Sequence, residues 1–122
     1  MKKFLLLLSV LGSMTVLANS KEDMVEDGLM NKYSIITDGV NSVRIHEYDI
    51  DIEGKKIELK VELKGDDQKQ EFEKLNKMKV REFFMEASKY TQTETGRNIP
   101  VEVRVELDKD LLPDEVLYKE IF

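Results

Sequence analysis

The sequence predicts an α+β domain in which one long amphipathic helix packs against an antiparallel β-sheet. Residues 43–63 alternate between apolar and polar side chains around a glycine, as the two strands of a β-hairpin do. Residues 65–92 repeat apolar side chains at helical spacing, and residues 99–107 alternate again as a C-terminal strand. The predicted order is therefore β-β-α-β, followed by a short terminal helix or strand.

The N-terminus has the pattern of a cleavable bacterial signal peptide at residues 1–18. Lys2 and Lys3 precede an apolar run, and Val16 and Ala18 supply small residues before a cleavage site. The run is shorter than the ~20 residues that a membrane-spanning helix needs, so we expect no stable membrane anchor after cleavage. The protein is predicted to be exported, with the periplasm favoured over the extracellular medium.

Residues 19–32 are polar and acidic, and we expect a polar N-terminal arm or a short helix there. Residues 33–122 are then long enough for a single α+β domain. The chain carries 25 acidic and 19 basic residues, for a net charge of −6. An acidic chain is repelled by phosphate backbones, which argues against nucleic-acid binding and favours a protein partner, in particular a basic one.

The chain contains no cysteine. Disulfides, thiolate catalysis and cysteine-based zinc sites are therefore excluded, and packing alone must hold the domain together.

The register of the hairpin follows from the parity of the apolar positions around Gly54. They are even-numbered before this residue and odd-numbered after it, so the loop must contain an even number of residues. Charge pairing favours the two-residue loop Glu53-Gly54, which places Asp51 opposite Lys56. A four-residue loop would place Asp51 opposite Glu58 instead.

Other strand details leave alternatives open. The apolar positions change parity between Ile45 and Tyr48, so either a bulge lies near His46 or two strand segments face different layers. Pro100 indicates an edge strand or the start of a strand. Residues 113–122 begin like a short helix, with a final strand as the alternative.

The predicted helix has an aromatic stripe formed by Phe72, Phe83 and Tyr90, which lie within about 20° of one another. We expect this stripe to cover the apolar face of the sheet. Phe83→Ala should then be among the most damaging substitutions, at about 3–5 kcal/mol.

Residues 49–54, DIDIEG, resemble the start of a calcium-binding loop with Asp49, Asp51 and Glu53 as ligands. Lys60 stands at the twelfth position, where such a loop needs a bidentate carboxylate, and strands replace the flanking helices. We therefore assign no metal ligand and interpret these acids as the solvent-facing half of a strand.

No other motif indicates chemistry, so we assign no catalytic residue and no cofactor. His46 is the only histidine, and we interpret it as a surface residue. Met78 and Met85 lie seven residues apart on the outer side of the helix, and flexible methionines suit an adaptable contact surface. Together with Arg97 in the following loop, which could bind an anion, they are the candidate partner-contact residues.

These observations predict an exported, small, acidic, non-enzymatic domain that binds another macromolecule in the bacterial cell envelope. An inhibitor or immunity-like protein that neutralises a basic enzyme is a specific version. Two alternatives belong to other classes. A small periplasmic hydrolase would use acidic residues with His46, and a subunit of an envelope assembly would add a strand across an open sheet edge.

Overall fold

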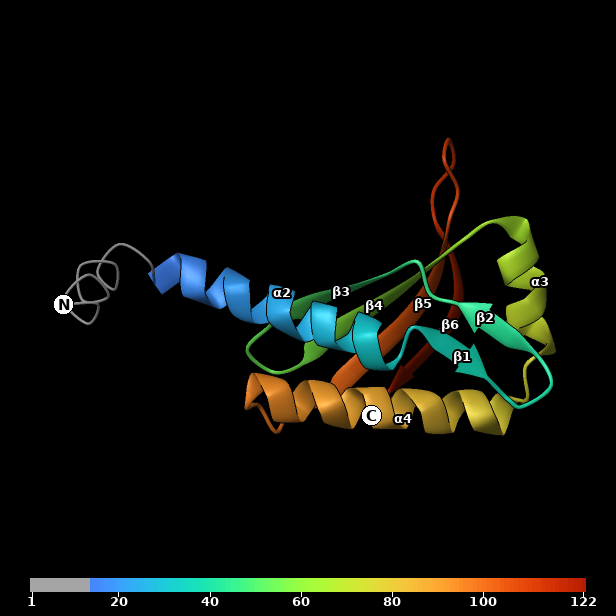
Figure 1. Ribbon diagram of the computed structural model, residues 1–122. Helices are drawn as coiled ribbons and strands as arrows, with labels where there is room; N and C mark the ends of the chain where they lie inside the picture. Colours follow the sequence, from blue (N-terminus) through green and yellow to red (C-terminus); the bar gives the residue numbers. More distant parts are fainter. Residues whose placement is uncertain (1–13) are drawn as a thin grey trace.

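The structure is a computed structural model that describes residues 14–122 (Figure 1). Most of the predicted signal peptide therefore lies outside the described residues, and its cleavage stays a prediction. Residues 14–18 begin the first described helix, and residues 19–32 complete it. The helices are α2 (Met14–Lys32), α3 (Asp66–Lys74) and α4 (Lys77–Thr95), and the strands are β1 (Ile35–Thr37), β2 (Ser42–Arg44), β3 (Glu47–Ile52), β4 (Ile57–Lys64), β5 (Val101–Asp108) and β6 (Glu115–Ile121).

The α+β class is confirmed, but the larger sheet is mixed and not antiparallel. Its strand order is β3-β4-β5-β6, and its central strands β4 and β5 run parallel. The chain returns through α3 and α4 to the end of the sheet where β4 began, so β5 starts there and runs the same way. The antiparallel prediction was wrong at this pair. A second, two-stranded antiparallel sheet joins β1 to β2.

The β3–β4 hairpin has a four-residue loop from Glu53 to Lys56, and not the predicted two-residue loop. The even number of loop residues is confirmed, and the N–H of Glu53 donates to the carbonyl of Lys56 at 2.9 Å. Charge pairing within the hairpin predicted the wrong register because Lys56 has another partner, Glu102 of β5, at 2.9 Å. Gly54 also lacks the positive φ that a type I′ turn requires.

The predicted single long helix is divided into α3 and α4 at Leu75 and Asn76. Leu75 has an extended backbone, and the side chain of Asn76 accepts a hydrogen bond from the N–H of Lys79 at 3.1 Å. This cap starts a new helix with its own orientation. Phe84, which is fully buried, therefore takes the central position that the unbroken stripe assigned to Phe83.

Hydroxyl side chains occupy part of the buried side of α4. Its buried residues are Val80, Phe84, Ala87, Ser88, Thr91 and Thr95. The hydroxyls of Thr91 and Thr95 donate to the carbonyls of Ala87 and Thr91 at 2.9 and 2.7 Å, which satisfies them within the helix. A pattern built only from apolar residues misses this face. Phe83 is partly buried against the core, and the cost of Phe83→Ala stays a prediction.

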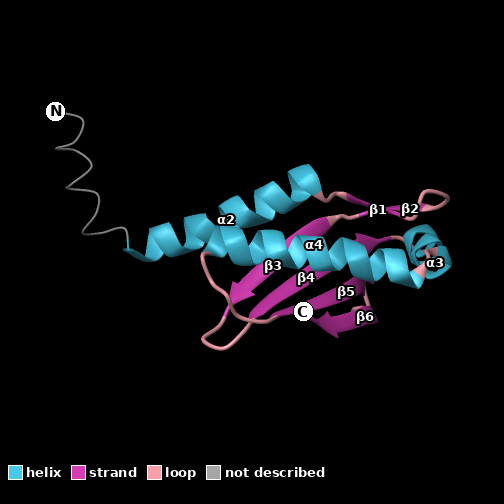
Figure 2. Cartoon of the chain, turned by 90° about the horizontal axis from the view of Figure 1, so that it is seen from below, coloured by secondary structure: helices cyan, strands magenta, loops and turns pink. Residues whose placement is uncertain are grey.

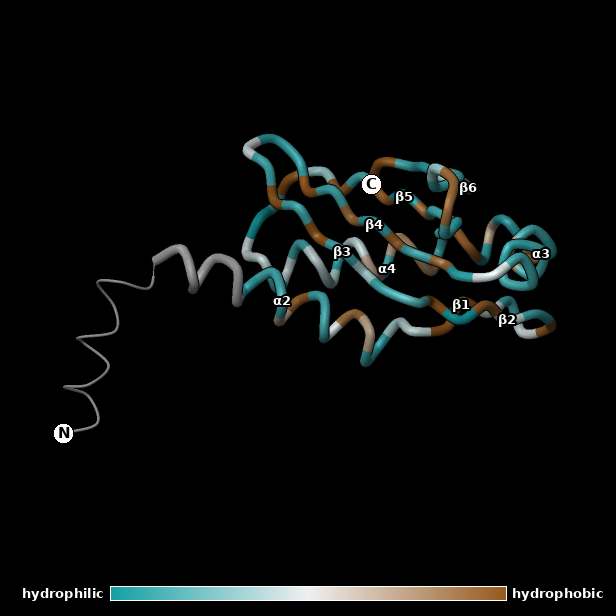
Figure 3. Tube along the Cα trace, turned by 90° about the horizontal axis from the view of Figure 1, so that it is seen from above, coloured by the Kyte–Doolittle hydropathy of each residue, from teal (hydrophilic) through white to brown (hydrophobic). Residues whose placement is uncertain are grey.

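The core lies between α4 and one face of the larger sheet, with α2 beside both (Figure 2). Hydrophobic and hydrophilic positions alternate along the strands of this sheet (Figure 3). The inward-pointing strand residues are Tyr48, Ile50, Ile57, Leu59, Val61, Leu63, Val101, Val103, Val105 and Leu107. Gly28 lets α2 approach α4 closely, since a Cβ there would overlap the hydroxyl oxygen of Tyr90.

The two edges of the larger sheet differ. At the β3 edge, Glu26 and Glu22 of α2 accept the backbone N–H groups of Ile50 and Ile52 at 2.7 and 3.3 Å. At the other edge, β6 has no neighbouring strand within residues 14–122. Side-chain carboxylates thus satisfy donors along one edge, while the other edge is open.

The structure also decides between the remaining strand alternatives. Pro100 initiates β5, and its carbonyl accepts the N–H of Ile57 at 2.9 Å. The edge interpretation was wrong, because β5 lies inside the sheet. The apolar positions change parity between Ile45 and Tyr48 because two strand segments meet there, and β2 and β3 belong to different sheets. The terminal element at residues 113–122 is the strand β6, and not a helix.

Candidate functional site

The face of the larger sheet that points away from α4 is lined by charged side chains. No helix within residues 14–122 covers it, as the view from above shows (Figure 3). We call it the acidic face, because its carboxylates outnumber its cations. Its charged residues are Glu47, Asp49, Asp51, Glu58, Lys60, Glu62, Lys64, Glu102, Arg104, Glu106, Asp108 and Lys119.

At the centre of the acidic face, the carboxylates are paired with cations. Glu102 and Glu106 are only 5% and 8% exposed, because β5 is an interior strand with long side chains on both sides. Glu102 lies 2.9 Å from Lys56, 3.2 Å from Arg104 and 3.8 Å from Lys119. The hydrogen bond from Lys56, supported by the other cations, lowers the pKa of Glu102. This centre is a salt-bridge network in which Lys56, Arg104 and Lys119 surround Glu102.

Towards β3, the acidic face places like charges opposite each other. Asp51 is the cross-strand partner of Glu58, and Glu47 is the partner of Glu62. Like charges in such pairs destabilise a sheet. Burial raises the pKa of Glu62, and the negative charges of Asp108 and Glu47 raise it further. Lys60 and His46 offset part of this effect on Glu62, and Glu58 lies 3.5 Å from the ammonium of Lys56. On this half of the face, Glu47 and Glu62 are carboxylates without an ion pair among the described residues.

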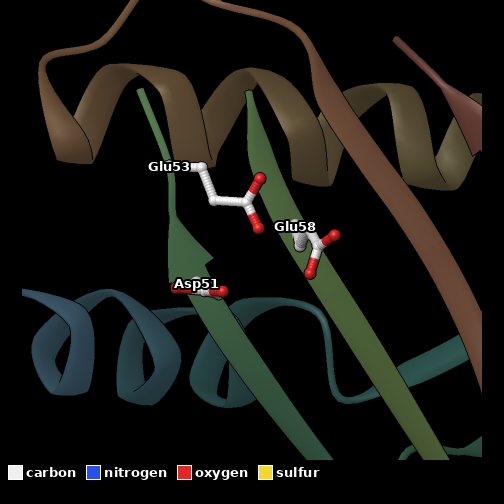
Figure 4. A group of neighbouring side chains, drawn as sticks. All are labelled: Asp51, Glu53 and Glu58. Carbon is white, nitrogen blue, oxygen red and sulfur yellow. The ribbon is translucent and has the colours of Figure 1, made fainter. Parts of the chain in front are cut away.

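Asp51, Glu53 and Glu58 bring one carboxylate oxygen each to within 4.8 Å of one another at the hairpin end (Figure 4). This group differs from the three acids of the DIDIEG motif, because Glu58 of β4 takes the place of Asp49. These three oxygens fall short of the about six to eight ligands that calcium takes. The ammonium of Lys56 also lies 3.5 Å from Glu58. Asp51, Glu53 and Glu58 therefore support only a loose association with a cation.

The predicted partner-contact residues do not form one surface. Met78, near the start of α4, is 72% exposed, whereas Met85 is only half-exposed. Arg97 is exposed and follows the C-terminus of α4, which lies about 26 Å along the helix axis from Met78. A role for any of them in partner contact stays a prediction.

His46 is exposed and lines a pocket that the sequence did not predict. The other lining residues are Ile35, Ser42, Arg44, Lys64, Asp67 and Gln68. Within the described chain, the imidazole of His46 makes no hydrogen bond to a hydroxyl or carboxylate, and a catalytic role for it stays a prediction. Sequence reasoning missed Arg44 and Lys64 because different elements bring them to His46.

The fold and the site together define a small α+β domain with helices on one face of a mixed sheet and charged side chains on the other. Within residues 14–122, no helix combines the length and the apolar composition of a bilayer span. Comparison with protein-family models, curated proteins and solved structures gives no match for this chain.

Proposed function

We propose that the protein is a small, exported, non-enzymatic domain of the bacterial cell envelope that binds a protein with a basic surface through its acidic face. An inhibitor or immunity-like protein that neutralises a basic enzyme would work in this way. The observation that carries the proposal is the pairing of Asp51 with Glu58 and of Glu47 with Glu62 across the hairpin.

These pairs weaken the hairpin by repulsion, in the range of about 0.2–1 kcal/mol for each pair. Glu47 and Asp51 are exposed, so packing does not require a carboxylate at either position. Lysine at either position would turn the repulsion into attraction. The face thus has carboxylates that repel each other and that packing does not require. Such a face suits electrostatic docking, because surface charge speeds association with an oppositely charged partner and disfavours wrong partners.

The part of the face next to β3 is the better docking surface. The central carboxylate of Glu102 already has three cationic neighbours, and a partner would have to displace them. By contrast, Glu47 has no ion pair within the described chain, and its neighbour Glu62 has none either. Lysine or arginine side chains of a partner would therefore gain most along β3 and the adjacent half of β4.

The test compares two variants that change the net charge equally. Glu47→Lys with Asp51→Lys replaces two carboxylates of the acidic face with cations, and Glu86→Lys with Glu94→Lys makes the same change on the exposed side of α4. Each protein is immobilised, exposed to a cell-envelope extract at low salt and eluted with a salt gradient. We expect the wild type and the α4 variant to capture the same basic proteins, and the acidic-face variant to lose them.

The control for folding is built into this design. Removing like-charge pairs should leave the melting temperature of the acidic-face variant equal to or above that of the wild type. Lost capture then cannot be attributed to unfolding. Equal capture by both variants, or no salt-sensitive capture by the wild type, would contradict the proposal.

A second candidate function is that of a subunit in an envelope assembly, joined by strand addition at β6. Phe122 exchanges backbone hydrogen bonds with Val101 at 2.8 and 2.9 Å, so the N–H and C=O groups of Ile121 and Lys119 point outward. Val116 and Ile121 are 53% and 59% exposed beside this open edge. An extended segment could therefore pair with β6.

Sedimentation velocity over a range of concentrations tests the self-associating form of this second function. Ile121→Pro removes an outward N–H without removing a hydrogen bond or an ion pair to β5, so it should abolish association while the fold remains. A wild type that stays monomeric at every concentration would exclude this form.

A further inference from the structure

A pocket of about 450 Å³ lies where the end of β2, the end of β4 and the start of α3 meet. Three of its lining side chains, Arg44, His46 and Lys64, can carry positive charge. Asp67 is the single carboxylate among the lining residues. The pocket is thus a cationic site in a chain whose overall charge is negative.

The side chains of Arg44 and His46 make no ion pair among the described residues, whereas the ammonium of Lys64 pairs with Asp108. Within the described chain, the side chains of Arg44 and His46 have no hydrogen bond either, and the ammonium of Lys64 is 3.8 Å from Asp108. By contrast, Arg81 lies 2.6 Å from a carboxylate oxygen of Glu120. The guanidinium group of Arg44 therefore keeps its donors for another molecule.

Hydrogen bonds fix the backbone positions from which the side chains of Arg44 and His46 extend. The N–H of Arg44 donates to the side-chain oxygen of Gln68 in α3 at 2.8 Å, and the N–H of His46 donates to the carbonyl of Glu62 in β4 at 2.8 Å. Residues two apart in an extended chain point to the same side. These anchors position Arg44 and His46 beside Lys64 without any contact between their charged groups.

We propose that this pocket binds the phosphate group of a small organic phosphate. The guanidinium fork of Arg44 matches the geometry of a tetrahedral oxyanion, and Lys64 and His46 supply further donors. The volume lies in the range of small-molecule sites, which leaves room for an organic part next to the phosphate. Ile35, which is 49% exposed and lines the same pocket, offers an apolar contact for that part.

This pocket lies at the end of β4, and of its lining residues Lys64 also belongs to the acidic face proposed for protein docking. The variants that reverse the charge of Glu47 and Asp51 leave all of its lining residues unchanged. Failure of one proposal therefore does not decide the other.

The experiment is a titration of ¹⁵N-labelled protein, monitored by two-dimensional NMR at constant ionic strength. The probes are inorganic phosphate, phenyl phosphate and benzoate, with sodium chloride as the balancing salt. We expect both phosphates at millimolar concentration to shift the amide signals of Arg44, His46, Lys64 and Gln68 together. Phenyl phosphate should bind more tightly than inorganic phosphate, and benzoate should bind more weakly than phenyl phosphate.

Two matched substitutions locate the site. Arg44→Gln should weaken phosphate binding about tenfold or more, because hydrogen bonds to a charged group are lost. Arg97→Gln makes the same chemical change at the other exposed arginine considered for anion binding, and it should leave the affinity unchanged. The Arg44 side chain supports no other described contact, so the spectrum outside the pocket should not change.

Several results would overturn the inference. Absence of phosphate-induced shifts, shifts centred on Arg97, or an affinity unaffected by Arg44→Gln would each exclude this pocket as a phosphate site. Benzoate that binds as tightly as phenyl phosphate would exclude the preference for phosphate. Equal affinities for the two phosphates would remove the proposed apolar contact with Ile35.

Discussion

Gly28→Ala tests how α2 packs against α4, because two physical effects predict opposite signs. Alanine inside a helix is favoured over glycine by about 0.5–1 kcal/mol. In this structure, however, the new methyl group would overlap the hydroxyl oxygen of Tyr90 and lie 3.0 Å from its ring carbon Cζ. Overpacking of this kind costs about 1–3 kcal/mol, so the variant should be less stable by about 0.5–2 kcal/mol.

The hydroxyl oxygen of Tyr90 is the atom nearest to a Cβ at position 28, so its removal should relieve much of the overlap. Within the described chain this hydroxyl makes no hydrogen bond, and Tyr90→Phe alone should therefore change stability little. We expect Gly28→Ala combined with Tyr90→Phe to be more stable than Gly28→Ala alone. The coupling energy between the two positions should be of the order of 0.5–3 kcal/mol.

The assay is urea denaturation of the four proteins in this double-mutant cycle, followed by circular dichroism. Gly54→Ala is the control, because a Cβ at Gly54 meets no atom within 4 Å and its φ is not positive. This control should unfold like the wild type. A Gly28→Ala protein that is stabilised whether residue 90 is tyrosine or phenylalanine would refute the close packing of α2 on α4.

The other predictions concern the core and the acidic face. Phe84→Ala should cost about 3–5 kcal/mol in the free energy of unfolding, clearly more than Phe83→Ala, as measured by chemical denaturation. Equal losses would contradict the division of the predicted helix. Glu47→Lys should raise the free energy of unfolding by up to about 1 kcal/mol, since it replaces repulsion from Glu62 with attraction, and thermal melting can measure this gain. The raised pKa of Glu62 means that the folded state binds its proton more readily than the unfolded state does. This carboxyl group should therefore add stability as the pH falls from neutrality towards its ordinary value of 4.5, and melting curves of Glu62→Gln should lack that contribution. Identical pH profiles for wild type and variant would contradict the burial of this carboxyl group.

Local patterns predicted the elements of the fold, and long-range partners decided their details. The parity of apolar residues around Gly54 is a property of two adjacent strands, so it correctly gave a hairpin with an even loop. The choice between loop lengths depended on Lys56, whose partner Glu102 lies on a strand much later in the chain. That pairing exists only because β4 and β5 are parallel.

The division of the long helix had a local signal in Asn76, whose side chain is a favoured helix cap. The continuous apolar spacing on both sides outweighed this signal. The buried threonines Thr91 and Thr95 were equally visible in the sequence, but their burial depends on hydrogen bonds to helix carbonyls.

The candidate sites were less predictable than the fold, because each one joins distant segments. The repulsive pair of Asp51 and Glu58 depends on the four-residue loop, whereas charge pairing within the hairpin favoured the two-residue loop. The phosphate pocket needs Arg44 and Lys64 to meet across two elements. Only their placement in space brings these cations together.

The parallel pairing of β4 with β5 has a consequence for the order in which the protein folds. Ile57 pairs with Val101 and Lys64 with Asp108, so the middle of the sheet cannot form until the last part of the chain is present. The hairpin before it is marginally stable on its own, and closing a long loop is a slow step. A chain emerging from the ribosome would thus remain without its sheet until β5 is available. Such delayed folding would suit passage through a narrow membrane channel, which an already folded domain could not enter.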